Sequence, residues 1–342
     1  MYNICNLILF LYNMKKIFLL FFLIYSLKFY SQWVNLNTGI NDNLVGVVFY
    51  QNNGLTAGEH GLYYTTNGGL GASSWSYFDI TDNQTNADIY HDTKFTHCYS
   101  SIFNYTDNGD VYACGQTETD LRAVIFKINI PSLSYELVYL GDLNTKLNKI
   151  DIDLSSKLFV GDDGLFIRML SNNQITVGNQ YIYENINTVS TYGGVSVGSD
   201  NNYWKTNSLG AINNNFTNIN IKDVWNTGTY YAYGVGYNTF CFVSTNASSP
   251  GVNYNTNFNT PLTGTCLLYN NQNNRKFVGS DDGIYKYITG TSFQNGTLEF
   301  QPSSLNYKIN EFWRVNNQNI IYACGDNGVI LNTDNEGGAT VP

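Results

Sequence analysis

The stretch LFVGDDGLFIRM (Leu158–Met169) contains the pattern that decides the fold: an apolar run ends in Gly161, turn residues follow, and a second apolar run begins. The pattern occurs seven times along the 342-residue chain. The other copies lie at Leu55–Thr66, Val111–Gly115, Val195–Thr206, Ala232–Thr245, Lys276–Thr289 and Ile321–Thr333. Their glycines are Gly58, Gly115, Gly198, Gly236, Gly279 and Gly325, so that successive glycines are 37 to 57 residues apart.

A period of roughly 40–50 residues with strand-like content is typical of propeller blades. One small antiparallel sheet cannot bury both of its faces, whereas sheets packed radially bury each other and a closed ring has no exposed ends. The composition agrees, because 15% aromatic and only 13% charged residues suit a sheet protein. We therefore predict an all-β fold, a seven-bladed β-propeller of four-stranded antiparallel blades.

A second repeated element lies upstream of each glycine run, and we interpret it as the innermost strand, with a polar pair facing the channel. Clear copies are LNKI (Leu147–Ile150), INTV (Ile186–Val189), IKDV (Ile221–Val224) and INEF (Ile309–Phe312). Looser copies are Leu44–Tyr50, Tyr99–Tyr105 and Thr265–Tyr269. The runs before and after the turn then form the second and third strands. Outer strands are predicted at Trp75–Ile80 and Glu299–Gln301, and an insertion between the first two blades at Thr81–His97.

The two ends of the chain together predict how the ring closes. The copy at Ile321–Thr333 has no fourth strand after it, and Gln32–Leu36 is a short apolar strand with no blade of its own. An open ring would leave an unpaired sheet edge at each end, which natural sheets avoid. We therefore predict that Gln32–Leu36 is the outer strand of the last blade.

Residues 1–31 differ in composition from the rest. Lys15 and Lys16 follow Met14, an apolar run spans Ile17–Leu27, and Ser31-Gln32 is a plausible cleavage point. This order is typical of a signal peptide, with Met14 as the start of translation. An uncleaved N-terminal anchor is the alternative, although the run is short for a membrane span. We therefore expect an exported protein (periplasmic, associated with the outer membrane or extracellular) whose residues 32–342 form a single propeller without a transmembrane span.

The charge of the exported part excludes one class of partner. Three of the 17 basic residues lie in the leader, so 14 remain against 26 acidic residues, a net charge of −12. Nucleic-acid binding depends on lysines and arginines gathered on one face. We therefore expect no nucleic-acid partner, and an acidic protein instead favours cationic partners or metal ions.

Five cysteines remain beyond the leader, and an odd number in an exported protein leaves at least one unpaired. Cys114 and Cys324 fall inside apolar strand runs, where a thiol behaves as a small apolar group. Cys98 with Cys114, and Cys241 with Cys266, are possible disulfide pairs. Buried thiols packed in the sheets are the other interpretation.

A resemblance adds to this interpretation. The Asp-box turn is resembled by Thr65-Thr66-Asn67-Gly68-Gly69 followed by Trp75. Weaker matches lie at Lys205-Thr206-Asn207, Ser244-Thr245-Asn246 and Asn332-Thr333-Asp334. The seven repeats after a signal peptide resemble the photosystem II stability/assembly-factor-like propellers of the BNR/Asp-box group, which includes sortilin and sialidases. The leader, with Gln32 after Ser31, resembles those of exported Bacteroidetes proteins. The resemblance implies a scaffold that holds other proteins. The chain departs from it in having Asn67 for the Asp of the box and only four arginines, so a photosynthetic role is unsupported.

The sequence offers little support for any known set of catalytic residues. Sialidase chemistry needs three converging arginines, and of Arg122, Arg168, Arg275 and Arg314 only Arg314 falls in a predicted inner strand. Ser-His-Asp catalysis lacks a Gly-x-Ser-x-Gly motif, and the histidines are His60, His91 and His97. His91, His97 and Cys98 could hold copper or zinc, but their spacing is unusual and solvent-facing loop residues are the simpler interpretation. No catalytic residue, metal ligand or cofactor is predicted.

Acidic residues recur in the turns between second and third strands, and these turns all emerge at one end of a propeller. They are Glu59, Asp162, Asp163, Asp200, Asp281, Asp282 and Asp326. One interpretation is an acidic ring that docks a partner with a basic surface or binds Ca²⁺. The other is that Asp and Asn simply form good hairpin turns.

The resulting functional prediction is an exported, non-enzymatic propeller that acts as a protein-interaction or assembly scaffold in the cell envelope, for example in a secretion complex. The alternative is a glycan-binding or glycan-cleaving, sialidase-like propeller at the cell surface. That alternative expects Trp or Tyr at the channel mouth, with carboxyl groups about 5–10 Å apart.

Overall fold

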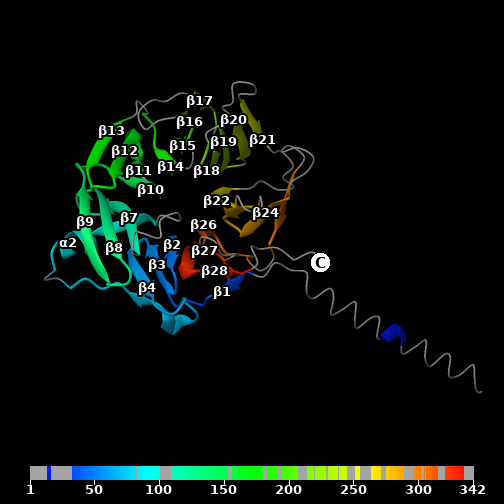
Figure 1. The fold of residues 1–342 in the computed structure, drawn as a ribbon, viewed down its shortest axis with the longest axis horizontal. Coiled ribbons are helices and arrows are strands. Elements are labelled where there is room, and N and C mark those ends of the chain that lie inside the picture. Colours follow the sequence, from blue (N-terminus) through cyan, green and yellow to red (C-terminus); the bar gives the residue numbers. More distant parts are fainter. Residues whose placement is uncertain are drawn as a thin grey trace, which may run out of the picture.

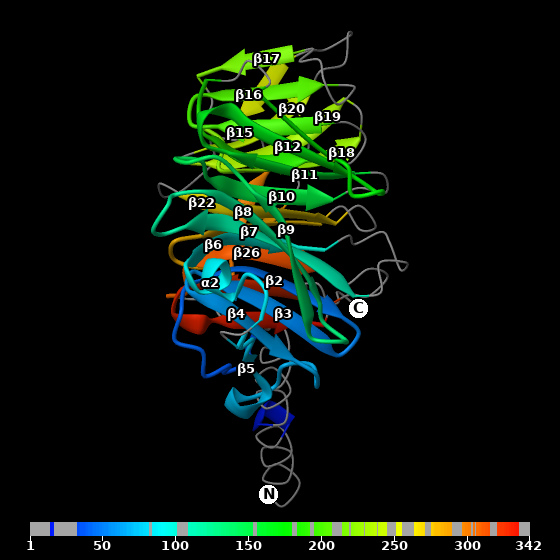
Figure 2. The same ribbon diagram turned by 90° about the vertical axis from the view of Figure 1, so that its left-hand side faces the viewer.

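The computed structural model describes residues 14–16 and 33–334. The described range 33–334 has gaps at 82–83, 101–108, 153–155, 180–182, 192–194, 207–213, 219, 229, 238, 245–250, 255–262, 271–274, 289–295, 302–303, 305 and 315–319. Seven four-stranded antiparallel sheets form a ring (Figure 1). From the side the ring is a flat disc whose strands run across its thickness (Figure 2). The predicted seven-bladed β-propeller is confirmed.

Each blade takes its strands in chain order from the channel outward, except that β1 supplies the outermost strand of the last blade. The first four blades are β2 (Leu44–Tyr50), β3 (Asn53–Gly58), β4 (Gly61–Thr65), β5 (Ser76–Tyr77); β6 (Thr93–Tyr99), β7 (Asp110–Thr117), β8 (Ala123–Asn129), β9 (Ser134–Leu140); β10 (Leu147–Ile152), β11 (Ser156–Gly161), β12 (Leu165–Leu170), β13 (Ile175–Asn179); and β14 (Ile186–Ser190), β15 (Val195–Ser199), β16 (Asn202–Thr206), β17 (Asn214–Thr217).

The last three blades follow the same plan. They are β18 (Asp223–Gly228), β19 (Tyr231–Gly236), β20 (Thr239–Ser244), β21 (Gly251–Tyr254); β22 (Gly264–Asn270), β23 (Arg275–Ser280), β24 (Ile284–Ile288), β25 (Thr297–Phe300); and β26 (Ile309–Arg314), β27 (Ile321–Gly325), β28 (Ile330–Thr333) with β1 (Val34–Asn35). The described part also contains helix α2 (Ala87–His91) and three 3₁₀ turns, at Ala72–Ser74, Asp162–Gly164 and Asp326–Gly328.

The ring closes as predicted, through the N-terminal strand. β1 pairs antiparallel with β28, Val34 opposite Asn332 and Asn35 opposite Leu331. The Leu36 N–H extends this ladder to the Ile330 carbonyl at 2.9 Å. Trp33, only 3% exposed, packs against Phe277 and Phe312, with ring centroids 5.8 and 6.1 Å away. The last blade is therefore completed by a strand from the opposite end of the chain.

The repeated glycine is explained by close backbone approach. A Cβ at Gly115, Gly161, Gly236 or Gly325 would overlap a backbone carbonyl oxygen near the start of the inner strand of the same blade. These oxygens belong to Lys94 within β6, to Lys146 and Lys308 directly before β10 and β26, and to Asn220 three residues before β18. Gly161 and Gly325 have extended φ angles near −160°, which any residue adopts. The requirement is therefore for space, not for an unusual backbone conformation.

Gly161→Ala is expected to lower the free energy of unfolding by about 1–3 kcal/mol, since the added methyl group must displace the Lys146 backbone. Gly178→Ala is the matched control in the same blade, because a Cβ there meets no atom within 4 Å. Urea unfolding of both variants measures the difference. Equal losses would show that close approach does not account for the repeated glycine.

A buried lysine lies between blades 5 and 6. Lys276 in β23 is 1% exposed, and its Nζ lies 4.8, 5.0 and 5.2 Å from the ring centroids of Tyr233, Tyr269 and Tyr287. Three aromatic faces attract the charged ammonium. Burial acts against the charge and lowers the pKa of Lys276 to about 8.

This lowered pKa makes the junction sensitive to alkaline pH. Between pH 8 and the ordinary lysine value of 10.5, the unfolded chain holds a proton that the folded chain has lost. Stability relative to Lys276→Met should therefore rise with pH across this window and stay constant below it. Urea unfolding of both proteins from pH 7 to pH 11 measures the difference, and a constant difference throughout would contradict the prediction.

Three predictions need correction or remain open. The inner strand of blade 2 is Thr93–Tyr99, not Tyr99–Tyr105, because its polar residues face the channel and resemble a loop in the sequence. The insertion predicted at Thr81–His97 therefore ends before Thr93. Residues 101–105 lie outside the described residues, as do residues 1–31, predicted to be a signal peptide, apart from a helical turn at residues 14–16.

Two further observations concern the cysteines and membrane helices. The five cysteines beyond the leader are free and buried, so neither possible disulfide forms and the buried-thiol interpretation holds for them. Within the described residues, no helix is long and apolar enough to cross a membrane.

Candidate functional site at the channel mouth

A funnel opens at the end of the channel where the inner strands begin. Its wider part has a volume of about 660 Å³ and is lined by residues from all seven blades, including Lys94, Asn148 and Lys222. A narrower part of about 260 Å³ reaches down to His97, Lys149 and Glu311. The inner strands therefore supply most of the wall and all of the floor of this site.

A β-bulge near the start of the inner strand shapes the wall. The pairing register shifts there in six blades. A bulge adds a residue to one strand and redirects its side chain. The bulged residues are Val45, Thr96, Asn148, Asn187, Thr265 and Asn310, and all six line the funnel.

Five of these residues also connect the blades. Asn148 and Asn310 donate through Nδ2 to the first carbonyl of the next inner strand, at 3.0 and 2.9 Å. Asn187 donates to the Ile221 carbonyl, two residues before β18, at 3.2 Å. Thr96 and Thr265 connect to the first carbonyl of the next inner strand through Oγ1, to Leu147 and Ile309. Hydrogen bonds of the funnel wall thus join neighbouring blades at five of the seven junctions.

The acidic turn residues lie at this same end. Glu59 and Asp281 line the wider funnel and Asp326 the narrower part. Asp162, Asp200 and Asp326 each accept a hydrogen bond from the inner-strand asparagine of their own blade, at 2.8, 3.0 and 2.8 Å. These three carboxylates therefore hold the inter-blade connections in place.

The remaining acidic turn residues have more exposed positions. Asp282 accepts from Ser280 and, at 3.0 Å, from Tyr285. Asp163 and Asp281 have exposed side chains. The structure therefore gathers the seven predicted acidic residues at one end, with different local roles, and the docking of a basic partner on them stays a prediction.

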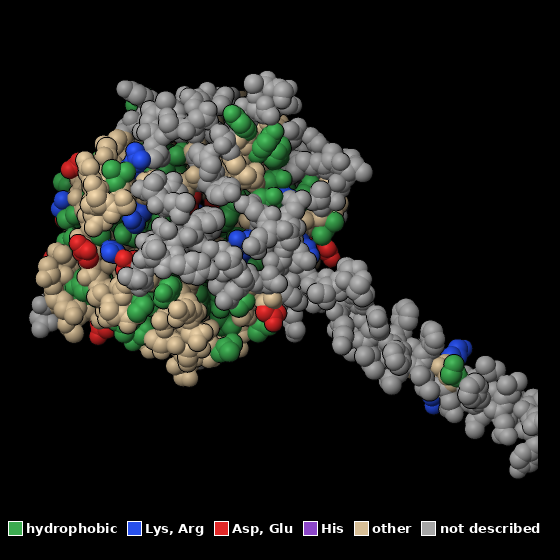
Figure 3. Space-filling view, viewed as in Figure 1, with side chains coloured by type: hydrophobic (Ala, Val, Ile, Leu, Met, Phe, Trp, Pro, Cys, Tyr) green, Lys and Arg blue, Asp and Glu red, His purple; other side chains and the backbone are tan. Residues whose placement is uncertain are grey.

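Five lysines share the funnel with these carboxylates, a feature that the sequence reasoning missed. Lys94 pairs with Glu59 at 3.4 Å, Lys222 with Asp200 at 2.7 Å, and Lys308 with Asp326 at 3.5 Å. The Lys222 hydrogen bond, followed by that of Asn187, lowers the pKa of Asp200. The mouth therefore has mixed charge. The described side chains in Figure 3 likewise show charges of both signs scattered over the face in view.

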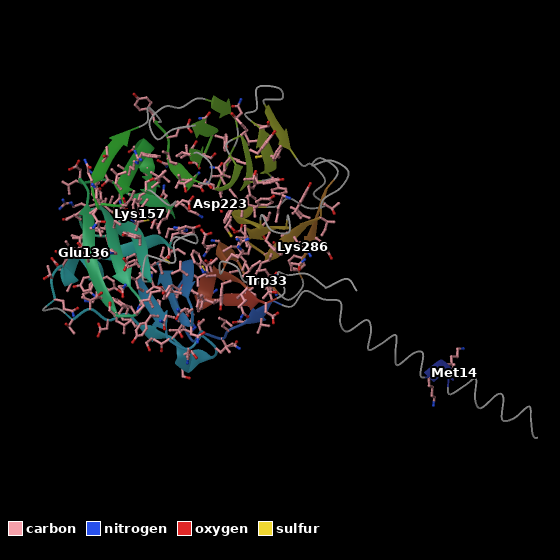
Figure 4. All side chains as sticks on the ribbon, in the orientation of Figure 1. Met14, Trp33, Glu136, Lys157, Asp223 and Lys286 are labelled. Carbon is pink, nitrogen blue, oxygen red and sulfur yellow. The ribbon has the colours of Figure 1, made fainter. Side chains whose placement is uncertain are left out.

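The funnel floor is a buried ionic network formed by His97 of β6, Lys149 of β10, Asp223 of β18 and Glu311 of β26. The Lys149 ammonium lies between Glu311, with which it pairs closely, and Asp223 Oδ1 at 3.2 Å. His97 Nε2 lies 2.8 Å from Glu311 Oε2. Asp223 also accepts from Thr188 Oγ1 at 2.7 Å and from the Leu267 N–H at 2.8 Å. Figure 4 labels Asp223 toward the middle of the ring, with Glu136 and Lys286 toward its outer edge.

Burial and neighbouring charges decide the protonation of the floor. Although burial alone would raise it, the pKa of Glu311 is held at about 2 by Lys149 and His97. Burial opposes the charge of Lys149, but Asp223 and Glu311 raise its pKa above the ordinary value. Burial raises the pKa of Asp223 against the opposing effect of Lys149. The core of the floor is therefore a charged lysine–glutamate pair.

His97 is held as a neutral hydrogen-bond donor. Its Nδ1 accepts from the Ile150 N–H at 3.3 Å, which leaves Nε2–H to donate to Glu311. Burial, and then the nearby Lys149, lower the pKa of His97. Because both ring nitrogens are occupied, His97 in this arrangement has no free lone pair to act as a general base.

The possible site of His91, His97 and Cys98 does not form. His91 Nε2 lies 2.8 Å from the Ile80 carbonyl, whereas His97 faces the funnel floor. Cys98 follows His97 in a strand and so points to the opposite face, against Gly46. The alternative of solvent-facing loop residues is wrong for His97, which is 2% exposed. Among the described residues, no group of three or more His, Cys, Asp or Glu could hold a metal ion.

The arginines do not share the floor. Arg122 directly precedes β8, and Arg168 lies in β12, both third strands away from the channel. Arg275 begins β23, a second strand, and Arg314 ends the inner strand β26. Arg314 alone therefore belongs to an inner strand, as predicted, and the floor cation is Lys149.

The predicted Asp-box-like turn of blade 1 has a defined geometry. Asn67 Oδ1 accepts from Thr65 Oγ1 at 2.9 Å and from the Gly69 N–H at 3.3 Å. The Trp75 indole N–H donates to the Gly69 carbonyl at 2.9 Å. Asn67 therefore ties this turn by accepting hydrogen bonds, the role that the Asp of the box would have.

Comparison with known proteins identifies shape similarity only. No family model and no curated protein sequence matches this chain. A chain of a mitotic checkpoint complex matches with a TM-score of 0.64 at 11% identity, over 90% of this chain and 92% of its own. YCF48 bound to a D1 peptide has the same score and identity, over 88% of this chain and 96% of its own. These likenesses establish the fold alone.

A third solved structure is the extracellular domain of a protein described as a hybrid two-component system from B. thetaiotaomicron. It matches with a TM-score of 0.63 at 15% identity, over 88% of this chain. The match spans only 40% of that chain. The propeller fold therefore also occurs as one part of a longer protein.

A sequence signal did exist for much of the site. The repeated LNKI and INEF elements give the bulged residue at their second position and the floor residue at their third. INTV gives a bulged residue at its second position, and IKDV gives the floor residue Asp223 at its third. His97 was missed because the inner strand of blade 2 was predicted too late in the chain. Lys146 and Lys308 directly precede inner strands and Lys94 is the second residue of β6, and only the assembled ring brings them together.

Proposed function

We propose that this chain is an exported, non-catalytic protein-interaction or assembly scaffold of the cell envelope, and that it docks its partner at the funnel mouth. The observation that supports this most is the contrast within the funnel. The floor residues His97, Lys149, Asp223 and Glu311 satisfy each other, whereas the rim displays half-exposed charges of both signs. Such a rim suits recognition of a polar partner. The solved complex of YCF48 with a D1 peptide is a precedent for peptide binding on this fold.

Two exposed carboxylates of the turns, Asp163 and Asp281, are proposed to contact basic groups of the partner. Asp281 lines the wider funnel, and Asp163 lies in the Asp162–Gly164 turn. The glycan alternative has less support, because the described residues that line the funnel include neither Trp nor Tyr. An aromatic platform at the mouth is what a sugar-stacking site requires.

Affinity isolation of the tagged full chain from its native envelope, with identification of captured proteins, tests the proposal. A partner should be captured at low salt and lost in part when Asp163 and Asp281 are changed to Asn. The matched control changes Glu136 and Glu299, two exposed carboxylates on outer strands, to Gln. Failure to capture any protein, or capture that the two double variants reduce equally, would refute docking at the mouth.

A further inference from the structure

The lysines of the funnel differ in one respect: whether a carboxylate of the chain faces them. Lys94, Lys222 and Lys308 on the rim, and Lys149 on the floor, each have a carboxylate within 3.5 Å. Lys146 lines the same funnel, is half-buried, and has no ion pair or side-chain hydrogen bond with any described residue. Among the described lysines of the funnel, Lys146 is therefore the one without an ion pair.

The reason lies in the turn of the preceding blade. Lys94 of blade 2 pairs with Glu59, the residue after the glycine in the turn of blade 1. Lys146 occupies the equivalent position in blade 3, so it faces the turn of blade 2, where the residue after Gly115 is Gln116. Gln116 contacts the segment that carries Lys146, because its Nε2 donates to the carbonyl of the preceding residue, Thr145, at 2.9 Å. A neutral amide therefore stands where the neighbouring junction has a carboxylate.

Lys94, which is 48% exposed in its side chain, adds a second cation beside this position. It lies opposite Gln116 in the β6–β7 ladder, and both residues line the funnel with Lys146. Its partner Glu59 lies on the side of blade 1, away from Lys146. The junction of blades 2 and 3 therefore presents two ammonium groups in a cavity with room for a side chain. The nearby carboxylates are already engaged, Glu59 by Lys94 and Asp162, whose N–H donates to the Lys146 carbonyl, by Asn148.

We propose that this junction is an anion subsite, in which Lys146, assisted by Lys94, binds the carboxylate of an Asp- or Glu-bearing segment of the partner. This subsite rests on the proposed docking at the funnel mouth and gives the partner a second chemical feature, an acidic residue beside its basic ones. An added carboxylate completes the same lysine–carboxylate pairing that the other rim lysines make within the chain.

The probes for the test are labelled, extended Gly/Ser peptides measured by fluorescence anisotropy against the full chain. One carries Glu residues and an amidated end, the second carries Gln and an amidated end, and the third carries Gln and a free C-terminus. The Glu peptide should bind most tightly. Lys146→Gln should weaken its binding about threefold to tenfold, as should Gln116→Glu, which supplies an internal carboxylate. Lys146→Arg should retain binding.

Lys286→Gln is the matched control, since Lys286 lies on the outer part of blade 6 (Figure 4). Lys146→Gln should fold normally, because the Lys146 ammonium has no partner among the described residues. Equal binding of the Glu and Gln peptides, equal effects of Lys146→Gln and Lys286→Gln, or binding of the free C-terminus alone would each overturn the subsite. Partner capture by the unmodified chain is a separate measurement, so the docking proposal can stand when this one fails.

Discussion

Glu311→Gln is expected to lower the free energy of unfolding by about 3 kcal/mol, because it leaves the buried Lys149 ammonium with one carboxylate in place of two. Lys149→Met should cost more, since it leaves Glu311 and Asp223 buried without their shared cation. Glu136→Gln, on the outer strand β9, should cost little, as surface ion pairs contribute at most about 1 kcal/mol. Urea unfolding of the three variants at neutral pH gives the ranking.

The effect of Glu311→Gln should also depend on pH in a defined direction. The pKa of Glu311 is about 2 in the folded chain and near 4.5 when unperturbed. The charge of Glu311 therefore stabilises the fold above pH 4.5, and this contribution is lost as pH falls from 4.5 to 2. The difference between wild type and Glu311→Gln should shrink over that window. A difference that is the same at pH 3 and pH 7 would contradict a charged floor.

Trp33→Ala is expected to lower the free energy of unfolding by about 3–5 kcal/mol, the usual cost of removing a buried Trp side chain. The indole is 3% exposed and joins blades 6 and 7 through Phe277 and Phe312. Its loss should also release β1 from β28. Hydrogen exchange of the Leu36 amide, which donates to the Ile330 carbonyl, should then accelerate with little change in blade 3.

Val34→Ala is the matched control for ring closure, because Val34 lies in the same strand but is 46% exposed. It should change stability by less than about 1 kcal/mol. An open last blade also exposes the edge of β28 to pairing with another chain. Trp33→Ala should therefore form more dimer or aggregate than Val34→Ala, measured by light scattering. Equal behaviour of the two variants would show that Trp33 does not secure closure.

The fold could be predicted largely because its physical causes repeat. A glycine is needed before the turn because a backbone carbonyl near the start of the inner strand leaves no room for a Cβ, as at Gly161 and Gly325. The outer strand of blade 7 was predictable from a different cause, the avoidance of unpaired edges. Blade 2 was misplaced at its inner strand because Lys94, Thr96 and His97 interrupt the apolar pattern there.

The candidate site was harder to predict from the sequence, since its contacts join residues that are distant along the chain. His97 and Glu311 are separated by 214 positions, and nothing local to either residue specifies the other. The acidic turns were recognised as a group, but their pairing with Asn148, Asn187 and Asn310 depends on the bulge in each inner strand. Repeated sequence patterns predict the backbone features that all blades share. The partners of a charged residue at a single position become clear only when the blades are assembled into the ring.

The pairing of β1 with β28 also has a kinetic consequence. The contact between Val34 and Asn332 spans about 300 residues, so the strand that leaves the ribosome first cannot reach its place until the last blade exists. Contacts of such long sequence separation slow folding, because the chain must be ordered before they form. Until then Trp33 and the edge of the final sheet are exposed and prone to association. The step that joins the two ends should therefore be the last and slowest in the assembly of the native ring.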